Sequence, residues 1–162
     1  CSAISDALQE LDPDHKDTYA ANTQAYLDKL TELDGEYQTV VDGAARKTVL
    51  FGDRFPFRYL VDDYGLNYYA AFAGCSAESE ASFETVSFLA KKVDELALPC
   101  VLTIEGKEHK IAQTIVQNTK QKDQKVMTMD SMQATTSDDV KNGVTYLSVM
   151  ENDLAVLKQA LN

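Results

Sequence analysis

Two acidic residues each follow a short apolar run, and this repeated arrangement is the strongest chemical signal in the sequence. Residues 100–104 lead directly into Glu105, and residues 125–129 lead directly into Asp130. In an open parallel sheet, ligands bind just outside the carboxyl ends of the strands. If the two runs form neighbouring strands, both carboxylates face one crevice, where paired oxygens suit a divalent cation or general acid–base chemistry. The alternative is that each acid only caps the helix that follows it.

Alternating strand and helix patterns along the chain must position these acids. Short buried-type runs predict four strands, at residues 48–51, 68–73, 100–104 and 125–129. Helical periodicity predicts helices at residues 55–63, 83–96 and 108–119, and a last one after Gly143, with a polar loop at 132–142. Gly65 suits a left-handed C-cap of the first helix, Ser82 could cap the second, and Tyr146 is expected on the apolar face of the last. Strands that alternate with helices indicate an α/β fold, here a four-stranded parallel sheet flanked by helices.

The N-terminal part of the chain is predicted to be helical throughout. Residues 2–11 form a short helix, and Pro13 restarts a second one that continues to about Gly43. Apolar and tyrosine side chains recur there at three-, four- and seven-residue steps, which is one face of a helix. The pattern divides the chain into a long N-terminal helical region, residues 1–46, and an α/β lobe, residues 47–162.

Composition excludes several classes of protein. The chain has 162 residues and a formal net charge of −11, so it lacks the basic patch that a nucleic-acid partner requires. No apolar stretch reaches the roughly 18–20 residues of a membrane span, and the sequence shows no charged n-region followed by an apolar h-region. Cys1, Cys75 and Cys100 show no CxxC spacing, which argues against a disulfide framework or a zinc knuckle. Cys100 is expected in the core.

The common catalytic motifs are missing from the sequence. It contains no GxGxxG, no GxxxxGK[ST], no GxSxG and no HExxH. With only His15 and His109, a nucleophile activated by histidine has few partners available. His109 lies four residues after Glu105 and could reach the same crevice, although an exposed position in the first helical turn is the alternative.

Several segments resemble the solute-binding lipoproteins of bacterial zinc and manganese ABC importers. Residues 53–60 and 63–66, DRFPFRYL and DYGL, resemble a helix that follows a strand in that family. Residues 102–105, LTIE, and 126–130, VMTMD, look like the family's strands that end in a ligand Glu and a ligand Asp. Residues 11–13 and 19–22 resemble the start of its long helix, and residues 146–152 resemble its C-terminal helix.

The resemblance implies a two-lobed protein whose lobes are joined by a rigid helix. This chain would be the connecting helix and the C-terminal lobe, beginning at an arbitrary boundary, with the N-terminal lobe, the signal peptide and the lipid anchor absent. The implied function is capture of a zinc or manganese ion and its delivery to an ABC transporter permease, outside the cytoplasm, and not catalysis. Glu105 and Asp130 would be metal ligands, and the missing lobe would supply the others, typically histidines.

One position departs from the family pattern. The family's usual C-lobe histidine ligand aligns with Arg54, whose guanidinium stays protonated and cannot bind a metal. Asp53 is adjacent and would be the substitute oxygen donor, although a capping role is equally open. Arg54 could instead pair with the acids from a position behind the ligands, Cys75 could add a soft ligand that favours zinc, and His109 would lie near them.

Two other functions remain open at this point. The first is a doubly wound enzyme in which Glu105 and Asp130 hold a catalytic magnesium ion, although no phosphate-binding loop supports it. The second is a metal-free interaction module of the same fold, which the replacement of the histidine by Arg54 favours.

Overall fold

The computed structural model describes residues 1–72, 81–106 and 108–162. Within it the chain forms two compact units, residues 1–39 and 40–162. The division into a helical region, residues 1–46, and an α/β lobe, residues 47–162, remains a prediction from the sequence.

The first unit consists of helices, as the sequence predicted. Helix α1 spans Ser2–Leu11, a 3₁₀ turn η1 spans Pro13–His15, and α2 spans Lys16–Asp42. The last residues of α2, from Val40 on, belong to the second unit. The turn is held by Asp12, whose carboxylate accepts a hydrogen bond from the Tyr19 hydroxyl at 2.9 Å and lies 2.9 Å from His15 Nδ1. Pro13 begins the 3₁₀ turn that leads into α2, because a proline is tolerated where the backbone N–H has no helical partner.

The second unit contains a four-stranded parallel sheet. Its strands are β1 (Thr48–Arg54), β2 (Asn67–Phe72), β3 (Cys100–Thr103) and β4 (Lys125–Thr128), and their order in the sheet is β2-β1-β3-β4. The four-stranded parallel sheet predicted from the sequence is therefore confirmed.

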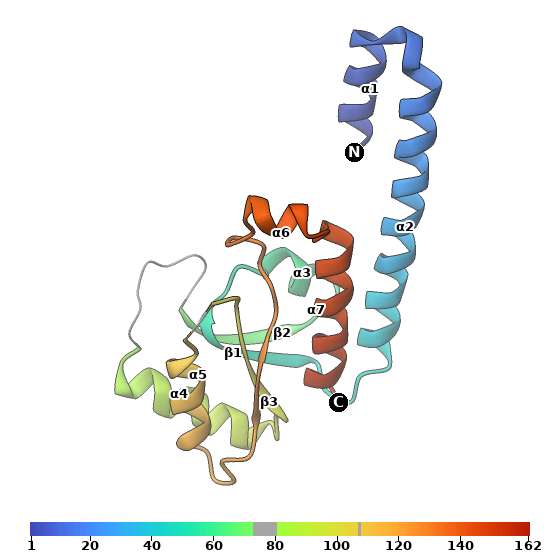
Figure 1. Ribbon diagram of the computed structural model, residues 1–162. Coiled ribbons are helices and arrows are strands. Elements are labelled where there is room, and N and C mark those ends of the chain that lie inside the picture. The colour runs from blue at the N-terminus through green and yellow to red at the C-terminus, as the bar shows by residue number, and fades with distance from the viewer. Residues whose placement is uncertain (73–80, 107) are drawn as a thin grey trace. The chain divides into compact units, whose positions relative to one another are not determined.

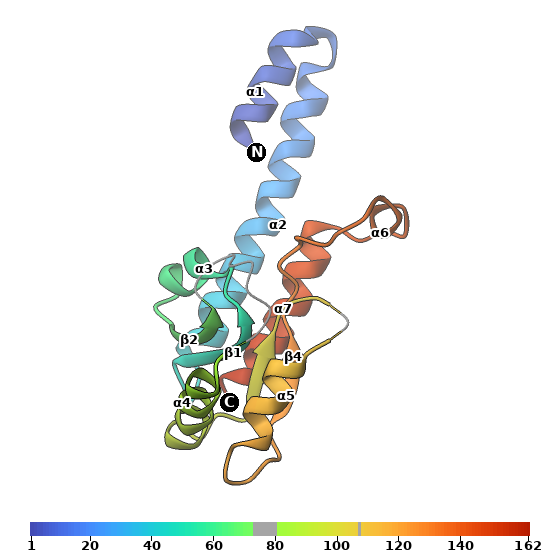
Figure 2. The ribbon, with the colours of Figure 1, turned by 90° about the vertical axis from the view of Figure 1, so that its left-hand side faces the viewer.

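Helices cover both faces of this sheet. Helices α4 (Phe83–Glu95) and α5 (Lys110–Gln117) pack on one face, α7 (Tyr146–Ala160) packs against β3 and β4 on the other, and α3 (Arg58–Asp63) lies beside β2 (Figures 1 and 2). The core under α4 and α5 is closed by strand residues such as Leu50 and Val101. The Cys100 thiol is buried as expected, and burial raises its pKa to about 11.

A glycine allows α5 to lie close to β1. A Cβ atom on Gly52 would come within 2.5 Å of the Ala112 Cα, closer than atoms approach without a shift of the backbone. The absent side chain therefore lets helix and strand pack together near the carboxyl end of β1.

Some predicted boundaries were wrong. Strand β1 continues through Asp53 and Arg54, which the sequence had placed after the strand. The next helix begins at Arg58 and not at Phe55, because a residue before proline is disfavoured in the α region. Phe55 is instead buried and stacks on the Tyr68 ring, with centroids 3.8 Å apart.

The predicted polar loop at residues 132–142 contains a helix. Helix α6 spans Ser137–Lys141 and begins at a capping box in which Thr136 and Asp139 exchange hydrogen bonds. The Thr-x-x-Asp spacing was the signal that the hydrophobic pattern missed. Helix α5 is also shorter than predicted, and Tyr146, expected on the apolar face of α7, is exposed.

No helix in the described part of the chain is long and apolar enough to cross a lipid bilayer.

Candidate functional site

Glu105 and Asp130 lie at the same level on adjacent strands. Strands β3 and β4 are neighbours, and Leu102 pairs with Met127 between them. Glu105 and Asp130 each come three positions beyond this pair, and a hydrogen bond from the Met129 N–H to the Thr103 carbonyl, at 3.0 Å, continues the pairing past the strand ends. The sequence prediction that the two acids come from neighbouring strands and share the carboxyl edge of the sheet is confirmed.

The Glu105 carboxylate holds the loop that follows β4. Its Oε2 accepts a hydrogen bond from the Ser131 N–H at 2.7 Å, and its Oε1 accepts from the Ser131 hydroxyl at 2.7 Å and the Gln133 N–H at 3.2 Å. Burial acts to raise the pKa of Glu105, but hydrogen bonds from Ser131, from Gln133 and from the N–H of Glu105 itself outweigh it and hold the pKa below its ordinary value.

The Asp130 carboxylate is fixed by its own loop and keeps one oxygen available. Its Oδ1 accepts a hydrogen bond from the Met132 N–H at 2.7 Å, the short-range pattern of an Asx turn. Its Oδ2 accepts no hydrogen bond from the described residues. An ionised carboxylate oxygen without a donor is suited to a cation ligand.

The alternative that each acid only caps the following helix is wrong. Helix α5 has His109 at its N-cap and α6 has Thr136 there, so neither Glu105 nor Asp130 occupies a cap. Asp53 does not cap either, since the N-cap of α3 is Phe57.

A third acid, which the sequence reasoning missed, lies behind the two strand ends. Asp153 on α7 is only 2% exposed, and its Oδ1 accepts a hydrogen bond from the Asp130 N–H at 2.8 Å. Burial raises the pKa of Asp153 to about 7, with the charges of Asp130 and Glu105 adding to that rise. The available signal was an acid on an apolar helix stripe, between Val149 and Leu157, where a buried charge is unusual.

Arg54 ends β1, the strand next to β3, but is not paired with Glu105 or Asp130. Phe51 pairs with Leu102, and an irregularity between Phe51 and Arg54 shifts the register of β1 before it ends. The ion pair of Arg54 is with its neighbour, its Nε lying 3.9 Å from Asp53 Oδ1, which also accepts the Arg54 N–H at 2.8 Å.

The remaining predicted residues add little to this edge. Cys75 lies outside the described residues, so its predicted role remains a prediction. His109 stands at the start of α5, and its Nδ1 is buried with no hydrogen-bond partner among the described residues. Within residues 1–72, 81–106 and 108–162, no three His, Cys, Asp or Glu side chains gather closely enough to hold a metal ion.

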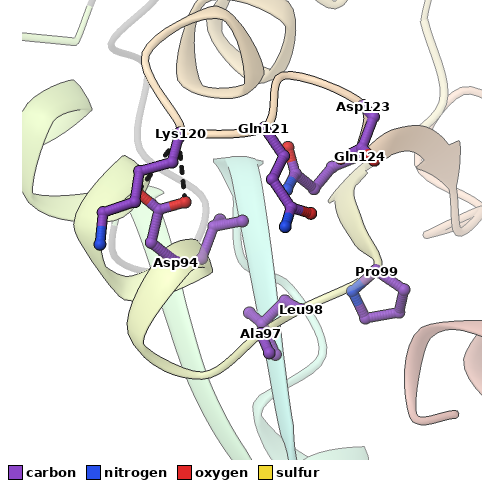
Figure 3. A pocket seen from close by; sticks show the side chains of 9 residues that line it. Asp94, Ala97, Leu98, Pro99, Lys120, Gln121, Asp123 and Gln124 are labelled. Atoms are coloured by element: carbon purple, nitrogen blue, oxygen red, sulfur yellow. Dashed lines mark hydrogen bonds between the residues drawn. The ribbon is translucent and has the colours of Figure 1, made fainter.

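A pocket of about 360 Å³ lies at the opposite, amino end of the strands (Figure 3). It is lined by residues that precede β3 and β4, among them Pro99 and Gln124, and by Asp94, whose carboxylate accepts the Lys120 N–H at 3.1 and 3.2 Å. Because it opens at the other end of the sheet, it is not part of the acidic site.

Comparisons with known proteins show that the chain is similar to proteins of zinc uptake. A model of the family described as the zinc-uptake complex component A, periplasmic (ZnuA), matches residues 1–160. The zinc-binding lipoprotein AdcA of Streptococcus pneumoniae is 31% identical over 156 residues, which are 96% of this chain and 30% of AdcA. The high-affinity zinc uptake system protein ZnuA of Bacillus subtilis is 27% identical over 158 residues, 98% of this chain and 48% of that protein.

Solved structures agree with the fold. The Zn(II)-bound ZnuA-like domain of S. pneumoniae AdcA superposes with a TM-score of 0.75 at 30% identity, covering 98% of this chain and 57% of that one. The metal-dependent lipoprotein YcdH of B. subtilis superposes with a TM-score of 0.80 at 26% identity, covering 98% of this chain and 58% of that one. The chain therefore spans between about a third and three fifths of the relatives that it matches.

Proposed function

Since this chain belongs to the family of the zinc-uptake complex component A, periplasmic (ZnuA), we propose that it captures zinc as part of a larger solute-binding protein. It would be the connecting helix and the C-terminal lobe of that protein, which delivers the ion to an ABC transporter permease. The relatives are described as zinc-binding lipoproteins and a zinc uptake protein, and this description favours zinc over manganese as the cargo.

The observation that carries the proposal is the pair of carboxylates at one level of the sheet. Glu105 and Asp130 follow adjacent strands, and the Oδ2 atom of Asp130 accepts no hydrogen bond from a described donor. Carboxylate oxygens bind zinc at about 2.0–2.2 Å, so one ion between the two strand ends is the arrangement that fits. No ion pair with a basic side chain of the described residues neutralises either acid.

This chain supplies only part of the coordination shell. Zinc takes four ligands in most protein sites, and the described residues offer no group of three that could hold a metal. The other ligands would come from the rest of the parent protein. Asp53 is a candidate third oxygen donor, although its Oδ1 already accepts the Arg54 N–H.

Arg54 changes the charge of the site relative to the family pattern. A guanidinium has no lone pair to offer a metal, so it cannot replace a histidine ligand. The ion pair with Asp53 partly neutralises the charge of Arg54, which weakens its electrostatic effect on Glu105 and Asp130. A cation can therefore still be attracted to the two strand ends.

The wider setting follows from the family. AdcA of S. pneumoniae and YcdH of B. subtilis are named as lipoproteins, which supports an extracytoplasmic location with a lipid anchor carried by another part of the parent chain. The permease and the remaining lobe would be its partners, and nucleic acid would not be one because the net charge is −11. A magnesium-dependent enzyme receives no support, since the relatives are zinc-binding and zinc-uptake proteins.

Zinc affinity of the full-length protein tests this function. We expect Glu105→Gln and Asp130→Asn each to weaken Zn²⁺ binding by about 100-fold or more, since loss of an outer partner alone costs 10–100-fold. A competition titration against a fluorescent zinc chelator measures this loss. Glu108→Gln is the matched control, because Glu108 is exposed and pairs with Lys110 at 2.7 Å.

Two results would contradict the proposal. The first is wild-type affinity in both Glu105→Gln and Asp130→Asn, which would place the ion elsewhere. The second is equal affinity of residues 1–162 and the full-length protein, which would mean that no ligand comes from outside this chain.

A further inference from the structure

Asp153 holds the backbone of Asp130 from the neighbouring helix. The side chain lies on α7, two turns into that helix, and is almost completely buried. Its Oδ1 lies 2.8 Å from the Asp130 nitrogen, which donates the hydrogen bond. An ionised acceptor shortens and strengthens such a bond in comparison with a neutral one.

This contact satisfies an N–H at the open edge of the sheet. The N–H groups of Lys125 and Met129 donate to β3-side carbonyls, those of Pro99 and Thr103. Successive N–H groups point to opposite sides, so the Asp130 N–H faces the side on which β4 has no neighbouring strand, and Asp153 is its acceptor. The backbone of the proposed ligand is therefore fixed by a side chain and not by a strand.

Two further contacts fix the direction of the Asp130 carboxylate. Its Oδ1 accepts the Met132 N–H at 2.7 Å, while the adjacent Ser131 N–H is held by Glu105 at 2.7 Å. With the backbone nitrogen and one carboxylate oxygen both fixed, the position of Oδ2 is largely determined. Metal ligands must be held within about 0.5 Å of their productive geometry. These contacts therefore determine whether the carboxylates of Asp130 and Glu105 can bind one zinc ion together.

A buried acid is an expensive way to satisfy one amide. Asp153 Oδ2 is buried with no hydrogen-bond partner among the described residues, which is unfavourable for a polar atom. Three of its apolar neighbours along α7, Val149, Leu154 and Leu157, form an ordinary core stripe. The acid therefore interrupts this stripe at a position that contacts the residue two beyond the end of β4.

We propose that Asp153 is a positioning residue for zinc capture, which fixes the Asp130 backbone so that the Asp130 carboxylate stands beside Glu105. It does not bind the ion itself. The inference rests on the proposed function, because it assumes that Asp130 is a zinc ligand.

Variants of the full-length protein, titrated with Zn²⁺ alone against a chelator, test this role. We expect Asp153→Ala to weaken Zn²⁺ binding about 10–100-fold, the range found for outer partners of metal ligands. Asp153→Asn keeps an oxygen acceptor for the Asp130 N–H and should bind Zn²⁺ within about threefold of the wild type, a rescue that this outer-partner role predicts. Leu154→Ala is the control for helix stability: it creates a cavity beside Asp153 and lowers the melting temperature, but should leave Zn²⁺ affinity unchanged.

The outcomes separate this inference from the proposed function. If Asp153→Ala binds as the wild type does while Asp130→Asn loses binding, the positioning role is wrong and the zinc site stands. If Asp153→Ala and Leu154→Ala weaken binding equally, the effect is only structural and the inference also fails. If Asp130→Asn and Glu105→Gln bind normally, the proposed function itself fails.

One measurement does not depend on the stability of Asp153→Ala. Hydrogen exchange of the Asp130 amide, followed by NMR, should be slow in the wild type and in Asp153→Asn. Fast exchange in the wild type would overturn the inference, because the amide would then have no persistent acceptor.

Discussion

The two ends of the sheet each use a carboxylate to hold a loop, but their electrostatic surroundings are opposite. At the amino end, Asp94 accepts the Lys120 N–H at 3.1 and 3.2 Å (Figure 3). At the carboxyl end, Glu105 accepts the Ser131 N–H and hydroxyl, each at 2.7 Å. Loop anchoring alone therefore does not distinguish the two ends.

The charges that surround the anchors do distinguish them. At the amino end, Lys92 donates to Glu95 at 2.6 Å and lowers the pKa of that carboxyl, and the charges of Lys91 and Lys120 act in the same direction. At the carboxyl end, burial raises the pKa of Asp153, and Asp130 and Glu105 act in the same direction as burial.

Asp130 and Glu105 disfavour the charged form of Asp153, as neighbouring like charges do unless a cation lies among them. The amino end needs no cation, since its lysines already provide the positive charge. At the carboxyl end Arg54 pairs with Asp53, and no described basic side chain pairs with Glu105 or Asp130, so a captured dication would supply positive charge there. Local charge, and not the presence of a loop-holding carboxylate, therefore favours the carboxyl end as the proposed binding end.

The largest expected effect is on the stabilisation that zinc gives to the folded protein. A ligand at 100 times its Kd stabilises the native state by about 2.7 kcal/mol. We expect Asp94→Asn to keep this zinc-dependent rise in melting temperature in the full-length protein, and Asp130→Asn to lose most of it. Differential scanning calorimetry with and without Zn²⁺ checks both variants. If Asp94→Asn also lost the zinc-dependent rise, zinc binding would not depend specifically on the carboxyl end of the sheet.

A smaller effect concerns the pH dependence of the metal-free protein. The pKa of Asp153 is raised from 3.8 to about 7. The folded state therefore keeps a proton that the unfolded state releases, so this stabilising contribution is complete below pH 3.8 and is lost as the pH rises through about 7. Asp153→Asn should remove that loss and make the metal-free protein more stable than the wild type at pH 8 by about 1–3 kcal/mol.

Urea unfolding of the metal-free, full-length protein at pH 5 and pH 8 measures this difference. Glu95→Gln is the control from the amino end. The pKa of Glu95 is lowered by Lys92, so its contribution is lost only as the pH falls below the ordinary range of a glutamate. Equal pH dependence of Asp153→Asn and the wild type would mean that Asp153 carries no proton near neutral pH.

The sequence predicted the parts of the fold that depend on local pattern. Ser82 was identified as a helix cap, and its hydroxyl accepts the Thr85 N–H at 3.1 Å. Gly65 was expected in the left-handed region and has φ +65°. Glu105 and Asp130 could be placed at one sheet edge because each follows a strand, and parallel strands end on the same side.

The contacts of the site could not be predicted in the same way. Glu105 and Ser131 are 26 residues apart, and Asp130 and Asp153 are 23 apart, so nothing local indicates that they meet. The helix pattern marked α7 as amphipathic but did not show which of its positions reaches the end of β4. Phe55 was assigned to a helix because a proline such as Pro56 is tolerated in the first helical turn, but the restriction that Pro56 places on Phe55 and the stacking of Phe55 on Tyr68 decide its position.

The smallest expected effect comes from the hydroxyl of Ser131. Ser131→Ala removes one of the hydrogen bonds to Glu105 but leaves the Ser131 N–H, which donates to Oε2 at 2.7 Å. We expect a loss of about 1 kcal/mol in the free energy of unfolding, the usual contribution of one hydrogen bond. Loss of a whole outer partner costs 10–100-fold in metal affinity. Zn²⁺ affinity should fall by less than about tenfold here, because the remaining hydrogen bonds still orient the Glu105 carboxylate.

Ser131→Thr retains the hydroxyl and should restore both values, as chelator competition and urea unfolding of the full-length protein will measure. If Ser131→Ala instead abolished zinc binding, the loop after β4 would supply a ligand itself. In that case the Glu105 anchor would hold part of the coordination shell, and the carboxyl end would differ from the amino end by its ligands as well as by its charge.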